Sequence, residues 1–190
     1  MIYYIQYNNF GQIICRGSAP DGADVSHLGA SVTQDEPFIF DFSEDYIQDG
    51  EIVRRPTSPS PHHEWDWPTK SWLPNLDAAR EAQRQAWNAW RDRELVAGYV
   101  HEGHRFHTND GFMGELHLLL KGHEEGLLTG TSSIRTMANE VLQKTGAEIK
   151  TLLLILGQHR QAIYQQSWVG KDALAGLTTL EDIVAGGPPS

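Results

Sequence analysis

The sequence predicts an α+β fold, in which a small antiparallel β domain precedes a domain of helices and a β-hairpin. Short runs of β-branched and aromatic residues separated by turn residues fill the first 55 positions. Three prolines fall within residues 54–61 (RRPTSPSP), and capped segments with helical spacing follow residue 75. We therefore divide the chain into an N-terminal β-rich domain, a Pro/Trp-rich linker, an α+β C-terminal domain and a flexible tail, at residues 1–55, 56–75, 76–185 and 186–190.

The composition is that of a chain with a hydrophobic core. Of the 190 residues 39% are hydrophobic and 9% aromatic, which is enough to bury a core. The single cysteine, Cys15, cannot form an internal disulfide, and we interpret it as a small strand residue. No apolar run reaches the roughly 18 residues of a membrane span, and the N-terminus lacks a basic-then-apolar signal pattern. We expect no membrane insertion and a cytoplasmic location, at least at first.

The net charge of −10 is unevenly distributed. Residues 1–53 contain nine acidic residues against Arg16 alone. This balance argues against binding to a nucleic-acid backbone, which requires clustered Lys and Arg. An acidic inhibitor that mimics nucleic acid towards a basic partner is one alternative function. The alternation of these acids with phenylalanines favours an ordinary half-buried sheet instead.

The N-terminal elements are predicted from turn residues between apolar runs. Residues 2–7 (IYYIQY) and 12–16 (QIICR) flank an Asn-Asn-Phe-Gly turn and indicate a β-hairpin. Residues 36–42 (EPFIFDF) form another apolar run with a proline near its start, where a strand tolerates proline. Residues 46–53 place Asp49-Gly50 between two apolar segments, the strongest hairpin signal in the chain. We expect one small antiparallel sheet over residues 1–55.

The linker region is unusually rich in tryptophan. Residues 62–67 (HHEWDW) alternate polar and aromatic side chains, and Trp72-Leu73 could return as a short partner strand. Each of Trp65, Trp67 and Trp72 could bury about 150–250 Å². We therefore interpret these three tryptophans as anchors of a packed or oligomeric surface, with a stacking platform for a ligand as the alternative.

The C-terminal domain is predicted to begin with a long helix. Asn75 is a candidate N-cap, and an Ala/Gln/Arg-rich segment continues to Ala97. Trp87 and Trp90 lie on a thin, mixed stripe that suits helix association, either between chains, as in a homotrimer, or within the domain. Gly98 can end this helix in the left-handed conformation.

A tight hairpin is predicted directly after this helix. A two-residue turn at residues 102–103 would pair Tyr99 with Phe106 and His101 with His104, all four on one face. Tyr99 and Phe106 are the candidate anchors of this ribbon.

The rest of the chain is predicted to be mostly helical. One helix starts near residues 108–110 and ends near Gly122 or Gly126, followed by a loop over residues 129–133. Residues 134–144 favour strand–turn–strand over a helix. Thr145 and Glu148 match a capping box for a long helix to about residue 174, and residues 178–182 repeat this pattern for a short last helix.

The chain shows no persuasive catalytic pattern. Three histidines are regularly spaced, but only His101 and His104 could bind one metal ion together, because His107 points away from them in the predicted hairpin. Neither a Gly-x-Ser-x-Gly motif nor a Gly-rich phosphate loop is present. We therefore predict a protein that is not an enzyme, with no catalytic, cofactor-binding or metal-binding residues and no cofactor. A metal-dependent enzyme is the remaining alternative.

Several segments occur in an order that is more specific than any one of them. They are YIQDGEIVRRP at 46–56, WDWPTKSW at 65–72, WRDREL at 90–95, GHRFHTN at 103–109, IRTMAN at 134–139 and TTLEDI at 178–183. In this order the chain resembles bacteriophage and prophage proteins encoded beside tail fibres, called tail-fibre assembly proteins or phage tail proteins, whose C-terminal domain has no assigned function. It departs from them at residues 135–136 and 138–139, where relatives usually have Trp-Thr and Asp-Asn.

This resemblance implies a protein that helps a trimeric receptor-binding fibre to fold, or that stays on the virion at the fibre or baseplate. The implied partner is a tail fibre or baseplate protein, and the implied location is the host cytoplasm during assembly and then the virion tail. The resemblance does not identify a catalytic residue.

Overall fold

The computed structural model describes residues 1–189 and confirms the predicted α+β class. The chain divides into two compact units, the first ending at Asn75 and the second beginning at Leu76. Seven strands form the first unit: β1 Ile2–Tyr7, β2 Ile13–Ala19, β3 Ser31–Gln34, β4 Asp45–Gln48, β5 Glu51–Arg54, β6 His63–Asp66 and β7 Ser71–Pro74. A short 3₁₀ turn at Ser26–Leu28 precedes β3.

The N-terminal hairpin is confirmed as β1 and β2, and β3 pairs with the other edge of β1. Ile5, Ile13 and Ile47 form the buried centre of this unit. Gly11 has φ +82°, and a side chain there would collide with the backbone of Ile47, whose N–H donates to the Gly11 carbonyl at 2.8 Å. A glycine is therefore required at the point where the β1–β2 turn crosses β4.

The prediction of a strand over residues 36–42 is wrong, and so is the prediction of one sheet over residues 1–55. Residues 37–41 have no regular secondary structure, and β4 pairs with β5 in a separate two-stranded sheet. Pro37 cannot donate a ladder hydrogen bond. Phe38 and Phe40 instead reach from this loop onto the isoleucine core, so the apolar run reflects packing rather than strand pairing.

The other two hairpin signals of this unit are also confirmed. Asp49 and Gly50 adopt φ +53° and +86° between β4 and β5, as the two central residues of a type I′ turn require. Residues 63–74, within the segment interpreted as a linker, form the antiparallel pair β6–β7, with Trp65 opposite Trp72.

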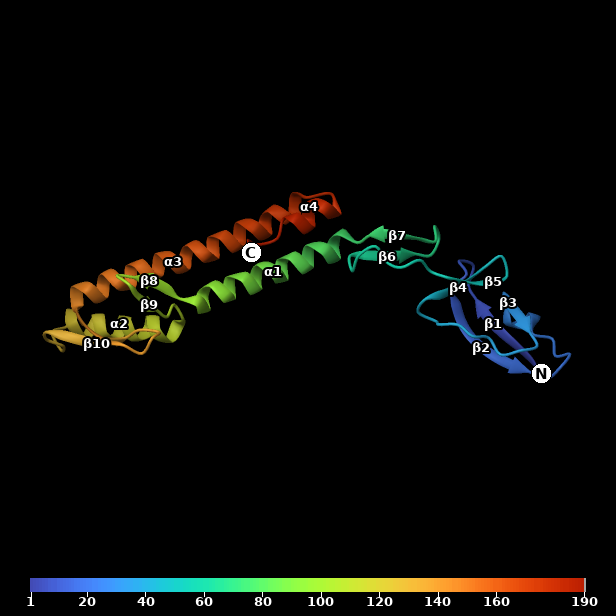
Figure 1. Ribbon diagram of the computed structural model, residues 1–190, viewed down its shortest axis with the longest axis horizontal. Coiled ribbons are helices and arrows are strands. Elements are labelled where there is room, and N and C mark those ends of the chain that lie inside the picture. The colour runs from blue at the N-terminus through green and yellow to red at the C-terminus, as the bar shows by residue number, and fades with distance from the viewer. Residues whose placement is uncertain (190) are drawn as a thin grey trace. The chain divides into compact units, whose positions relative to one another are not determined.

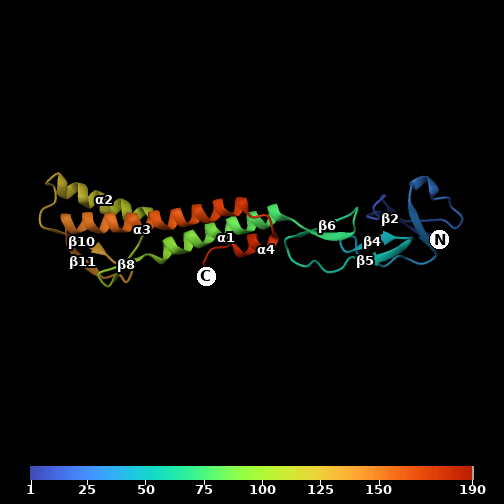
Figure 2. The same ribbon diagram turned by 90° about the horizontal axis from the view of Figure 1, so that it is seen from above.

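The second unit consists of helices and two hairpins. Its elements are α1 Leu76–Ala97, β8 Tyr99–His101, β9 His104–Phe106, α2 Asp110–Glu124, β10 Thr131–Arg135, β11 Val141–Thr145, α3 Gly146–Ala173, a 3₁₀ turn at Leu174–Gly176, and α4 Leu180–Ala185. Figures 1 and 2 show α3 alongside α2 over its first part and alongside α1 over the rest. None of the helices described is long and apolar enough to cross a membrane.

Most of the predicted elements of this unit are confirmed. Asn109 caps α2, the capping box of Thr145 and Glu148 is formed, and Thr179 caps α4. The strand–turn–strand prediction is also confirmed, although β10 begins at Thr131, inside the predicted loop at residues 129–133.

Two buried clusters hold the second unit together. One joins α2 and both hairpins to the first part of α3 through Phe106, Phe112, Leu116, Ile134, Ile149, Leu152, Leu153 and Leu156. The other joins α1 and the 3₁₀ turn after α3 to the second part of α3 through Trp87, Trp90, Ile163 and Leu174. The long helix α3 therefore supplies side chains to both clusters.

Candidate functional site

The three linker tryptophans surround the side chain of Arg55. Trp65 is 7% exposed and packs its ring against those of Tyr46, Trp67 and Trp72, with centroid distances of 5.8, 6.3 and 5.4 Å. The Arg55 guanidinium carbon lies 5.7, 5.3 and 6.0 Å from the ring centroids of Trp65, Trp67 and Trp72. Trp72 Nε1 donates to the Pro56 carbonyl at 2.7 Å. The cation beside these rings therefore comes from the chain itself. Because Arg55 directly follows β5, the cluster joins the β6–β7 hairpin to the end of that strand.

We expect Arg55→Met to lower the stability of the first unit by about 1 kcal/mol, because the substitution removes the cation from all three rings while keeping an apolar stem. Near-ultraviolet circular dichroism during thermal unfolding measures the effect on the indoles. Arg84→Met, at an exposed position of α1, is the control. An Arg55→Met midpoint equal to that of the control would show that the cation contributes nothing.

The other two predicted tryptophan anchors lie in the core of the second unit. The Trp87 and Trp90 rings meet edge to face at 5.4 Å, and Trp87 Nε1 donates to the Gly186 carbonyl at 3.0 Å. Gly170 of α3 lies directly under the Trp87 ring, where a Cβ would collide with it. Of the two predicted roles for this stripe, the structure shows packing within the domain.

The predicted β8–β9 hairpin is confirmed in its register, with Tyr99 opposite Phe106 and His101 opposite His104. Phe106 is buried, and the Tyr99 ring packs against that of His159 on α3, tilted by 39° with 4.6 Å between centroids. His104 Nδ1 lies 2.9 Å from Glu140 Oε2. Among the described residues, no group of three or more His, Cys, Asp or Glu side chains is placed to hold a metal ion.

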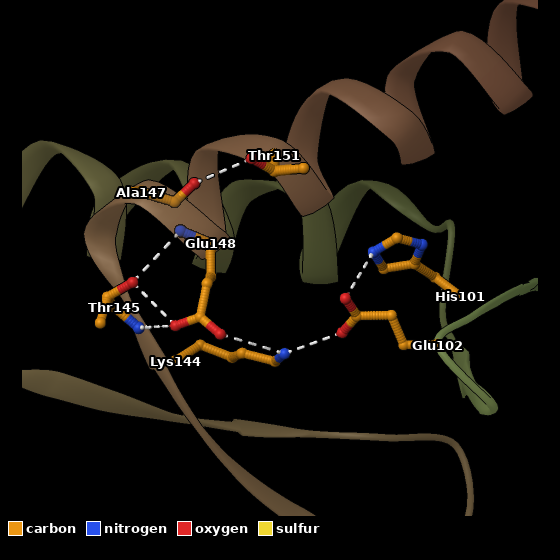
Figure 3. Close-up of polar contacts among 7 residues, drawn as sticks. All are labelled: His101, Glu102, Lys144, Thr145, Ala147, Glu148 and Thr151. Carbon is orange, nitrogen blue, oxygen red and sulfur yellow. Dashed lines mark hydrogen bonds and ion pairs between the residues drawn. The ribbon is translucent and has the colours of Figure 1, made fainter.

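Beside this hairpin, a pocket of about 180 Å³ opens between the β8–β9 turn and the start of α3. Its polar lining consists of His101, Glu102, Lys144, Glu148 and Thr151. Lys144 Nζ lies 3.0 Å from Glu102 Oε2 and 3.4 Å from Glu148 Oε1, so one ammonium bridges two carboxylates (Figure 3). Sequence reasoning missed this bridge. The i,i+4 spacing of Lys144 and Glu148 could have indicated half of it.

The electrostatics of this pocket hold each charged group in its charged state. The hydrogen bond to Glu102 raises the pKa of Lys144, and the hydrogen bond from Lys144 lowers the pKa of Glu102. The backbone N–H of Thr145 is the main cause of the lowered pKa of Glu148. These shifts move each pKa further from neutral pH, and a general acid or base works best with a pKa close to the working pH. The contacts of Lys144 with Glu102 and Glu148 join the β8–β9 turn to the start of α3.

The His159 imidazole of α3 has a shifted pKa. Burial lowers it, because the charged imidazolium loses solvation under the Tyr99 ring. The unfolded chain therefore binds a proton more readily than the folded chain does. The stability that the neutral His159 side chain contributes is fully present above its ordinary pKa of 6.5. This contribution is lost as the pH falls below 6.5 and through the lower pKa of the folded state.

We expect the second unit to lose stability between pH 6.5 and the onset of carboxylate titration, and His159→Gln to remove most of this loss. Urea unfolding followed by circular dichroism at several pH values tests the expectation. His117→Gln, on α2, serves as the matched control. An equal pH slope in wild type and His159→Gln would contradict it.

The outer side of α2 carries an open hollow of about 970 Å³. Leu118 lies in it with 73% of its surface exposed. Gly114 leaves open space where a side chain would otherwise project. In the part of the chain that the structure describes, the carboxylates of four residues line the hollow together with a single lysine, Lys121. The four acidic residues are Asp110, Glu115, Glu124 and Glu125. An exposed leucine with an acidic rim suits contact with a protein that offers apolar and basic groups. No predicted anchor lies here, because sequence reasoning looked for aromatic residues.

The chain is thus an α+β protein with an exposed leucine and several carboxylates on the outer side of α2. Residues 78–185 match the family described as Domain of unknown function (DUF4376), and the chain belongs to this family. The match runs from the first turn of α1 to the end of α4, so it includes every helix and both hairpins of the second unit. No curated protein and no solved structure gives a significant match.

Proposed function

We propose that this chain is a non-enzymatic bacteriophage tail protein that binds the tail fibre or baseplate. It acts as a fibre-assembly chaperone in the host cytoplasm, as a virion-associated tail component in host attachment, or as both. The observation that carries the proposal is the order of the segments that resemble tail-fibre assembly proteins, from residues 46–56 to residues 178–183.

These segments are distributed over both units. Residues 46–56 contain most of β4, all of β5, and Arg55, and residues 65–72 contain the tryptophans around that arginine. Residues 103–109 contain β9 and the Asn109 cap of α2. Because each segment forms a turn, a cap or a packed cluster, their shared order favours a shared architecture.

We assign partner binding to the α2 hollow. The exposed Leu118 supplies an apolar contact, and the acidic rim favours a partner with basic groups at the matching positions. Asp110 in this rim is held by Arg160 at 2.6 Å, which fixes one carboxylate in place. Such an interface binds more weakly as the salt concentration rises, because exposed charges are screened.

The assignment is tested by pull-down of the neighbouring fibre protein with Leu118→Asp. The expected result is a loss of fibre binding of at least about tenfold, because a charge replaces the apolar contact. Leu127→Asp is the matched control, since Leu127 is 75% exposed in the loop that follows α2. If Leu118→Asp binds the fibre as well as the control and the wild type do, the α2 hollow is not the site.

The location is tested separately by mass spectrometry of purified phage particles. Peptides from this chain at a fixed ratio to the fibre support the virion-component role. Their absence removes that role and leaves the chaperone role, which acts before the particle is complete.

A further inference from the structure

A second surface of the molecule is unusual for its lack of charge. Between residues 151 and 169 of the fully described helix α3, the exposed side chains are Thr151, Leu154, Gln158, Gln161, Ala162, Gln165, Gln166, Trp168 and Val169. None is charged, although 21% of the chain is Asp, Glu, Lys or Arg. Leu154 and Trp168 are 60% and 53% exposed. We call this surface the uncharged α3 face.

The spacing within this face is that of a helix–helix seam. Leu154, Gln158, Gln161, Gln165 and Trp168 alternate in steps of four and three, which is the heptad spacing of coiled coils. The opposite side of α3 already carries the buried residues of both cores. The uncharged face is therefore a second, exposed stripe on the same helix.

A groove lies along the first part of this face. It has a volume of about 510 Å³ and is bordered by Met113 and His117 of α2 and by the α3 residues from Leu153 to Gln165. Gly157 within it leaves open space, since a Cβ there would have no neighbour within 4 Å. Another helix could therefore approach α3 closely at this position.

The charge distribution indicates what covers the face. Two copies of a chain with net charge −10 repel each other, and they do so least where their surfaces are neutral. Glutamine amides both donate and accept hydrogen bonds, so a row of glutamines is complementary to itself. The charged residues at the ends of the face are balanced in sign, with Glu148 and Lys150 at one end and Lys171 and Asp172 at the other.

We infer that the uncharged α3 face binds the same face of a second copy of this chain. A two-fold pair uses one patch twice, which requires this kind of self-complementarity. Gln161 lies seven residues from both Leu154 and Trp168, so it sits at the centre of the seam in either orientation of the partner helix. Trp168, whose ring lies 5.9 Å from that of Tyr164, supplies a large aromatic anchor.

Sedimentation equilibrium of the full chain tests the inference without any other protein. The wild type is expected at twice 21.3 kDa, and this mass should persist at high salt because the face carries no charge. Gln161→Glu and Gln161→Lys are each expected to sediment at 21.3 kDa, because like charges meet at the seam. An equimolar mixture of the two variants should recover the higher mass.

Gln85→Glu and Gln85→Lys, at an exposed glutamine of α1, are the matched controls and should keep the wild-type mass. Circular dichroism confirms that each variant is folded, and Gln165→Glu replaces any variant that is not. A monomeric wild type, Gln161 variants with unchanged mass, or a mixture that stays monomeric would each overturn the inference. Because no fibre is present, none of these outcomes bears on the proposed tail function.

Discussion

Trp87→Ala is expected to lower the free energy of unfolding of the second unit by about 3–5 kcal/mol. The Trp87 side chain is 7% exposed, packs on Trp90 and fits against Gly170, so its removal leaves a cavity between α1 and α3. The substitution also leaves the Gly186 carbonyl without its indole donor.

Urea unfolding followed by far-ultraviolet circular dichroism measures this loss. Trp87→Phe is the graded control, since phenylalanine fills part of the cavity without supplying the hydrogen bond to Gly186. The expected order of stability is wild type, then phenylalanine, then alanine. An alanine variant within about 1 kcal/mol of the wild type would show that α1 and α3 do not pack through this tryptophan.

Gly98→Ala is expected to cost roughly 3 kcal/mol, from a strained backbone and a steric clash together. Gly98 adopts φ +72° after α1, and a Cβ there would collide with the Phe106 carbonyl and Met137 Sδ. The end of α1 would have to move away from the end of β9 and from Met137. This loss should appear as a lower thermal midpoint of the second unit.

Gly103→Ala separates these two causes. Gly103 has φ +81° in the β8–β9 turn, but a Cβ there would have open space around it. Its substitution should therefore cost only the backbone term, about 1–2 kcal/mol. Equal losses at both glycines would mean that the close approach of the hairpin to α1 is not rigid.

Much of the fold could be predicted because its signals are local. The Asp49-Gly50 and Glu102-Gly103 turns and the Thr145 capping box each depend on a few neighbouring residues, and all three are confirmed. The false strand at residues 36–42 shows the limit of such signals. Its apolar residues are there to cover the isoleucine core, and no local pattern distinguishes that use from strand pairing.

The roles of the aromatic residues could be predicted only in part. Their size indicated burial, but their partners come from distant positions, as with Trp87 and Gly186, which are 99 residues apart. The Lys144–Glu102 bridge spans 42 residues and gave no signal at all. The uncharged α3 face was overlooked because periodicity drew attention to the buried stripe of the same helix.

Binding to a tail fibre is the central claim, and co-expression with the adjacent fibre gene tests it most directly. The measurement is the yield of soluble, trimeric fibre with and without this chain, at equal fibre expression. We predict that the trimer yield rises when the chain is present and that the two proteins purify together. Equal trimer yields in both cases, with no co-purification, would contradict the account.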